Sequence, residues 1–119
     1  MHNQNVGRLG EKRAEEHYLA QGHRLLDKNY RTPFGEFDLI FKKAATTVFV
    51  EVKCRSSLSF GRPEEAITFK KRNSLRKGME YYRLGYEYVE QDYRCDVASI
   101  ILSGDGEVAH FEVFENVGV

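Results

Sequence analysis

The chain has 119 residues and a formal net charge of zero, with 18 lysines and arginines against 18 aspartates and glutamates. Its length predicts one domain over residues 1–119, with a disordered start at 1–5. A neutral chain has no global positive field, which argues against simple coating of nucleic acid, although local patches can bind. The two cysteines form no CxxC pattern, no apolar run is long enough to span a membrane, and no signal-peptide core is present. We therefore expect a cytoplasmic protein without a zinc site or a membrane partner.

The first predicted element is a helix over residues 6–21, closed by Gly22. At 100° per residue, Glu11 lies on or beside the buried face marked by Tyr18. A carboxylate in that position is costly unless something pairs with it. Glu11 therefore either contributes to a metal site or water network, or flanks the core and pairs with a neighbouring cation such as Arg8.

Three strands are expected next, at about residues 24–30, 35–40 and 48–53, and the second and third of these segments are rich in β-branched and aromatic residues. A proline and a glycine in residues 31–35 mark a turn between the first two strands. Residues 42–46 are short enough to form a hairpin loop between the second and third strands. Antiparallel pairing of the second and third strands follows from that short loop.

The second and third strands contain the acidic residues on which the functional interpretation depends. Side chains alternate along a strand, so Glu51 and Lys53 share one face, and Glu36 and Asp38 share a face by the same rule. Antiparallel pairing would bring Asp38 near Glu51. Carboxylates suit Mg²⁺ or Mn²⁺, and a nearby lysine could stabilise charge on a phosphate or position a nucleophile. The pattern indicates a metal-dependent nuclease site; the alternative is a cross-strand pair of surface charges.

A second helix is expected over residues 63–84, with Pro63 at its start and apolar residues at helical spacing from Ile67 onward. The rest of its surface is the densest positive stretch of the chain and comprises Lys70, Lys71, Arg72, Arg76, Lys77 and Arg83. These bases form either a phosphate-binding face or the ordinary solvated side of a helix.

Two further strands are expected over residues 94–102 and 108–114, with a turn at 103–106 between them. Asp96 either adds to the acidic group or pairs with Arg94. The order of elements is helix, three strands, helix and two strands, which predicts an α/β sandwich built on a central mixed sheet.

Several short motifs are spread over nearly the whole chain. They are Gly10-Glu11, Asn29-Tyr30-Arg31, Gly35-Glu36-Phe37-Asp38, Val50-Glu51-Val52-Lys53, Phe60-Gly61, Ala66-Ile67, Lys71 and Arg94-Cys95-Asp96-Val97. Together they resemble the successive motifs of the YraN family of small bacterial proteins, with Phe37 where that family has isoleucine. The resemblance implies a restriction-endonuclease-like fold of the PD-(D/E)xK type, arranged α-β-β-β-α-β-β and similar to archaeal Holliday junction resolvases.

The resemblance also implies roles for individual residues. The acidic helix position falls on Glu11, the metal-binding aspartate on Asp38, and the ExK pair on Glu51 and Lys53, so these four would be catalytic and the three acids would bind Mg²⁺ or Mn²⁺. Lys71 matches a lysine of the second helix that would reach the phosphate. The bases expected to hold the nucleic-acid backbone without reading its sequence are Arg31, Arg55, Lys70, Lys71 and Arg76.

The function expected on these grounds is a metal-dependent endonuclease, or a Holliday-junction-resolvase-like enzyme, that hydrolyses phosphodiester bonds in DNA. A branched, two-fold substrate would favour a homodimer, because two cuts need two related sites. Two alternatives stay open: a nucleic-acid-binding or adaptor protein that keeps the fold but hydrolyses little, and a plain protein-interaction domain.

Overall fold

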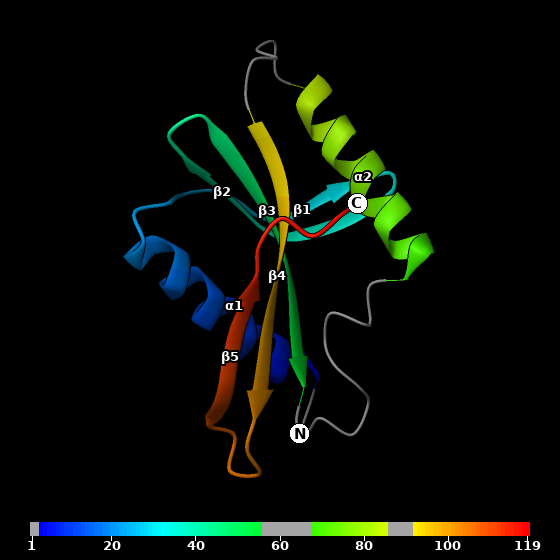
Figure 1. Ribbon diagram of the computed structural model, residues 1–119. Helices are drawn as coiled ribbons and strands as arrows, with labels where there is room; N and C mark the ends of the chain where they lie inside the picture. Colours follow the sequence, from blue (N-terminus) through cyan, green and yellow to red (C-terminus); the bar gives the residue numbers. More distant parts are fainter. Residues whose placement is uncertain (1–2, 56–67, 86–91) are drawn as a thin grey trace.

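A computed structural model of the chain describes residues 3–55, 68–85 and 92–119, which form an α/β structure with one mixed sheet and two helices (Figure 1). In chain order the elements are α1 (Asn3–Ala20), β1 (Arg24–Thr32), β2 (Gly35–Lys43), β3 (Thr46–Arg55), α2 (Phe69–Leu84), β4 (Asp92–Leu102) and β5 (Val108–Phe114). The α/β class and the order of elements agree with the prediction. No helix within these ranges is long and apolar enough to cross a membrane.

The five strands lie in the spatial order β1-β2-β3-β4-β5. All neighbouring strands are antiparallel except β3 and β4, which run parallel because the chain returns through α2 before it enters β4. The predicted mixed sheet is therefore confirmed. Its register pairs Leu39 of β2 with Val50 of β3, and Glu51 of β3 with Val97 of β4.

Each helix covers one face of the sheet (Figure 1). Helix α1 packs Ala14 and Tyr18 into the hydrophobic cluster on one face, and α2 packs Leu75 and Tyr82 into the cluster on the other. Because both faces are covered, the central strand β3 is buried throughout residues 47–51. A carboxylate on this strand is thus carried into the interior of the protein.

Two glycines let the helices lie close to the sheet. A Cβ added at Gly10 of α1 would lie 2.9 Å from the Cβ of Cys54, and one added at Gly78 of α2 would lie 2.8 Å from Cε2 of the buried Phe37. Any side chain at these positions would push the helix away from the sheet. Gly78 costs the helix roughly 1 kcal/mol relative to alanine, and this close contact is the physical reason for it.

Helix α2 begins later than the sequence predicts. Thr68 is extended, with φ −72° and ψ 167°, and its side chain accepts a hydrogen bond from the backbone N–H of Lys71 at 3.1 Å. A residue in this conformation is an N-cap and marks the start of a helix. The prediction of one continuous helix over residues 63–84 is therefore wrong at Thr68, while Pro63 and Ile67 themselves lie outside the described residues.

Candidate metal and nucleic-acid site

The candidate site lies where β2 separates from β3. The backbone pairing of these strands ends at Leu39 and Val50. One residue further along, Oδ2 of Asp38 accepts the backbone N–H of Val52 at 2.7 Å. The carboxylate thereby satisfies a donor of β3 that the backbone of β2 no longer pairs with. This hydrogen bond holds the side chain of Asp38 between the two strands.

The same region breaks the alternation of side chains along β2. Leu39 packs into the cluster on the α1 face, whereas Phe37, two residues earlier, packs into the cluster on the α2 face. Residues two apart should share a face in a regular strand. Strict alternation, the basis for expecting Glu36 and Asp38 on one face, therefore does not hold along this part of β2.

Asp38 and Glu51 form a carboxyl pair, as the antiparallel register predicts. Burial, a hydrogen bond with the Glu51 side chain and the negative charge of Glu51 raise the pKa of Asp38 to about 8, while the N–H of Val52 acts in the opposite direction. Two carboxyl groups this close do not both ionise at neutral pH unless a cation compensates them. The pair is therefore a place that takes up either a proton or a positive ion.

Two lysines lie on the same side of the sheet as Glu51. Nζ of Lys71, in the first turn of α2, lies 2.7 Å from Oε2 of Glu51. Lys53 follows Glu51 by two residues and is half-buried. Val52 between them packs into the α1-side cluster, so Glu51 and Lys53 both point to the α2 face. Lys71, predicted as part of an open phosphate-binding helix face, instead reaches into the site and binds Glu51.

Glu11 approaches the carboxyl pair from α1 without joining it. Burial and the charge of Glu36 raise the pKa of Glu11, Lys28 lowers it, and Glu11 in turn helps to raise the pKa of Asp38. Among the residues described, no three or more His, Cys, Asp or Glu side chains are close enough together to hold a metal ion. Of the three predicted acidic ligands, the structure thus brings two into contact and leaves the third as an outlying negative charge.

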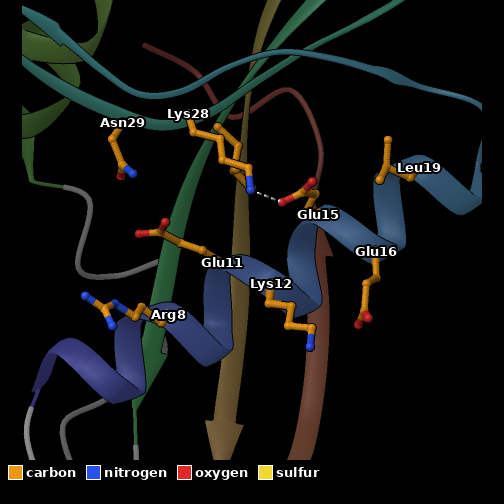
Figure 2. A pocket seen from close by; sticks show the side chains of 9 residues that line it. Arg8, Glu11, Lys12, Glu15, Glu16, Leu19, Lys28 and Asn29 are labelled. Carbon is orange, nitrogen blue, oxygen red and sulfur yellow. Dashed lines mark ion pairs between the residues drawn. The ribbon is translucent and has the colours of Figure 1, made fainter.

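A pocket of about 490 Å³ opens beside Glu11, between α1 and β1 (Figure 2). It is lined by Arg8, Glu11, Lys12, Glu15, Glu16, Leu19, Lys28, Asn29 and Leu39. Nζ of Lys28 pairs with Oε1 of Glu15 at 2.8 Å and ties β1 to α1. Figure 2 shows Glu11 and Glu15 on the side of α1 that faces β1, with Lys12 and Glu16 pointing away. Lys28 from β1 is the cation that lowers the pKa of Glu11. Figure 2 marks no ion pair between Glu11 and the bases drawn with it.

The predicted phosphate-binding bases lie in different environments. Lys70 and Arg76 are exposed on α2. Arg31 is exposed at the end of β1, where its Nε lies 3.3 Å from a carboxylate oxygen of Glu36. Arg55 is half-buried at the last position of β3. Among the bases that the structure describes, Lys71 is the one that forms an ion pair with Glu51. The other predicted bases would have to bind phosphates that lie outside the carboxyl pair.

A second buried acid, Asp96, belongs to the core. It accepts hydrogen bonds from Arg94 Nε at 3.1 Å, Arg94 Nη2 at 3.2 Å, the Tyr18 hydroxyl at 2.6 Å and the backbone N–H of Asn116 at 2.9 Å. These donors occupy its lone pairs and join α1 and β4 to the C-terminal segment. The predicted pairing of Asp96 with Arg94 is confirmed, and Asp96 is not an open ligand.

The donors at the carboxyl pair fit a hard divalent cation. Mg²⁺ is commonly held by one or two protein carboxylates and completes its coordination with water and phosphate oxygens. Asp38 and Glu51 could supply two such carboxylates. The buried thiol of Cys95 has a pKa raised to about 12, by burial and by the charges of Glu51 and Asp96. It therefore stays protonated and adds no thiolate ligand.

The chain matches known sequences over most of its length. Residues 10–100 match the uncharacterised protein family UPF0102. A UPF0102 protein of Dictyoglomus turgidum is 40% identical over 116 residues, which is 98% of each chain. Another, of Caldicellulosiruptor bescii, is 39% identical over 119 residues with the same coverage. A third, of Clostridioides difficile, is 39% identical over 102 residues, or 86% of this chain and 90% of the relative. These names assign no activity.

Proposed function

Because this chain belongs to the UPF0102 family, whose description gives no activity, we propose its function from the site: a Mg²⁺- or Mn²⁺-dependent endonuclease that hydrolyses phosphodiester bonds in DNA. This is the family whose motifs the sequence resembles. The restriction-endonuclease-like fold that the resemblance implies is part of the same proposal. The α/β class, the mixed sheet and the helices on both faces are compatible with it.

The observation that carries the proposal is the contact between Asp38 and Glu51. A cross-strand pair of surface charges would leave both groups in water, where neither pKa would move far. Here the side chain of Glu51 is only 6% exposed, and the pKa of Asp38 rises to about 8. Two ionised carboxylates held together in the interior repel each other unless a proton or a cation compensates them. A divalent cation is the partner that would use both groups.

The residues around the carboxyl pair have distinct roles in this proposal. Asp38 and Glu51 would hold the ion, which when bound would polarise the phosphodiester and lower the pKa of a water. Lys53 would place a positive charge near the reacting phosphate, where negative charge develops. Glu11 would attract or orient water at the edge of the site. Arg31 and the exposed bases of α2 would hold the DNA backbone.

One observation favours a second candidate, a nucleic-acid-binding or adaptor protein that hydrolyses little. Lys71 lies 2.7 Å from Glu51 and already compensates its charge. A protein that had no need of a metal could keep this ion pair permanently. The two candidates differ in one measurable property, because only the nuclease needs a divalent ion bound through Asp38 and Glu51.

The test is cleavage of labelled four-way junction, flap, single-stranded and duplex DNA with Mg²⁺ or Mn²⁺. Wild type is compared with Asp38→Asn and Lys53→Met, and DNA binding is measured in parallel. Matched controls are Asp92→Asn and Lys43→Met, which make the same chemical changes at exposed positions outside the site. The nuclease proposal expects cutting that both site variants lose and both controls keep, while DNA binding persists.

Other outcomes of this test separate the candidates. Binding without cutting under any metal would refute the nuclease and support the binding protein. Neither binding nor cutting would overturn nucleic acid as the substrate class. If the junction is the preferred substrate, we expect a homodimer, because paired cuts need two related sites. Sedimentation velocity that finds only monomer, with and without junction DNA, would contradict the dimer.

A further inference from the structure

The charge on Glu51 is balanced from a different element of the fold. Glu51 lies on β3, whereas the ammonium group 2.7 Å from its Oε2 belongs to Lys71 on α2. The side chain of Glu51 is 6% exposed, so water does little to stabilise its charge. Asp38, the other acid of the pair, contributes a hydrogen bond but no positive charge. Without a metal ion, Lys71 is therefore the cation on which this buried carboxylate depends.

The backbone and the side chain of Lys71 are held to different degrees. The backbone N–H of Lys71 donates to Oγ1 of Thr68 at 3.1 Å, and that of Arg72 donates to the Thr68 carbonyl at 2.9 Å. These bonds fix the first turn of α2. The side chain of Lys71 is 35% exposed and has four rotatable carbon–carbon bonds. The ammonium group can therefore leave Glu51 while the helix stays in place.

A divalent cation at the carboxyl pair would bind the same carboxylate that Lys71 contacts through Oε2. Two cations a few ångströms apart repel each other strongly in a site with little water. Glu51 can therefore bind Lys71 or the ion strongly, but not both. An ammonium group released by the ion would stay within side-chain reach of the site, where it could bind a phosphate oxygen of a substrate held by the metal.

We propose that Lys71 is a built-in counter-ion that a divalent metal displaces from Glu51, so that metal loading frees the Lys71 ammonium for the phosphodiester backbone. The inference rests on the proposed function for the metal itself and adds a coupling between metal binding and this lysine. The role of Lys71 in this scheme is distinct from that of Lys53. It keeps the carboxyl pair compensated before the metal arrives and offers a positive charge to the substrate afterwards.

The direct test measures the accessibility of the Lys71 ammonium in the wild-type protein. Brief reductive dimethylation is followed by peptide mass spectrometry with fragment ions that separate neighbouring lysines. The experiment is run with EDTA and with saturating Mg²⁺. We expect labelling of Lys71 to rise several-fold with Mg²⁺, because the ion pair that shields it is lost. Lys70, exposed and adjacent, is the internal control and should be labelled equally in both conditions.

The second test is calorimetric titration with Mn²⁺ of wild type, Lys71→Met and Lys70→Met. Lys71→Met removes the competing ammonium and should tighten Mn²⁺ binding by about tenfold. This factor corresponds to the free energy of one hydrogen bond to a charged group, taken at the low end of its usual range. Lys70→Met should bind Mn²⁺ like the wild type. In EDTA, Lys71→Met should also melt at a lower temperature than Lys70→Met, and Mn²⁺ should remove that difference.

The outcomes distinguish the two proposals. If wild type binds no Mn²⁺, the metal site and the exchange both fail. If wild type binds Mn²⁺ and Asp38→Asn does not, the metal site stands. In that case two results would overturn the displacement of Lys71 while leaving the metal site intact. One is labelling of Lys71 that Mg²⁺ does not change, and the other is Lys71→Met binding Mn²⁺ no more tightly than wild type does. The labelling experiment needs no variant, so a misfolded Lys71→Met would still leave the inference open to refutation.

Discussion

Replacing Asp38 with asparagine should stabilise the metal-free protein at alkaline pH. Burial and Glu51 raise the pKa of Asp38 from 3.8 to about 8. A group whose pKa is raised in the folded state gives a contribution to stability that is fully present below the unfolded-state pKa. That contribution is lost as the pH rises through the folded-state pKa. Wild type should therefore weaken between about pH 4 and about pH 8, and the asparagine variant, which cannot ionise, should not share this loss.

The size of the effect follows from the shift in pKa. At about 1.4 kcal/mol per unit, a rise from 3.8 to about 8 sets a ceiling of roughly 6 kcal/mol on the loss. Asp38 is only partly buried, so water screens some of this energy, and we expect about 2–4 kcal/mol. The amide oxygen of asparagine can still accept the N–H of Val52, and its amide hydrogens can donate to Glu51. The variant should therefore keep the fold.

The assay is urea denaturation in EDTA at about pH 6 and about pH 9.5, a range that covers about half of the expected loss, for wild type, Asp38→Asn and the exposed control Asp92→Asn. The free energy of unfolding of wild type should fall more steeply with pH than that of Asp38→Asn, and Asp92→Asn should follow wild type. A difference between wild type and Asp38→Asn that is the same at both pH values would refute the reasoning. Added Mg²⁺ should stabilise wild type at the higher pH and have little effect on Asp38→Asn.

Two further predictions concern the contacts that position the site. Arg94→Met should lower the free energy of unfolding in urea by about 3–5 kcal/mol, because it leaves the fully buried Asp96 without its cation. The control Arg83→Met breaks an exposed ion pair within α2 and should lower it by less than about 1 kcal/mol. Equal losses in the two variants would contradict this prediction. Gly78→Ala should lower stability by about 1–3 kcal/mol, because its Cβ would meet a buried aromatic ring at 2.8 Å. Gly7→Ala, with nothing within 4 Å, should raise stability by up to about 1 kcal/mol, and a gain at Gly78 would refute the close-packing argument.

The carboxyl pair could be predicted from the sequence because its geometry is local. Only two residues, Ala44 and Ala45, separate β2 from β3, and a loop this short leaves antiparallel pairing as the natural arrangement. Continued one residue past its last pair, Leu39 and Val50, that register brings Asp38 near Glu51. The face shared by Glu51 and Lys53 follows from strand alternation, which holds there because β3 stays paired with β4 through Arg55 after its pairing with β2 has ended at Val50.

The start of α2 shows where local signals compete. Pro63, followed by two glutamates, is a strong sequence signal for a helix N-terminus. Thr68, a residue type favoured at N-caps, is a second signal, and its hydroxyl caps the helix in the structure. The sequence contains both signals and does not rank them. The choice at Thr68 depends on where α2 must begin in order to pack Leu75 on the sheet and reach Glu51 with Lys71.

The sequence by itself determined the element order, the mixed sheet and the pair of acids on adjacent strands, because short loops and strand periodicity act over a few residues. Only the tertiary structure decided that β2 leaves β3 at Asp38, that Glu11 stays outside the carboxyl pair, and that Lys71 compensates Glu51. Those relations depend on how two helices dock on opposite faces of one sheet. Docking is set by the packing of many distant side chains at once, and no short pattern of residues encodes it.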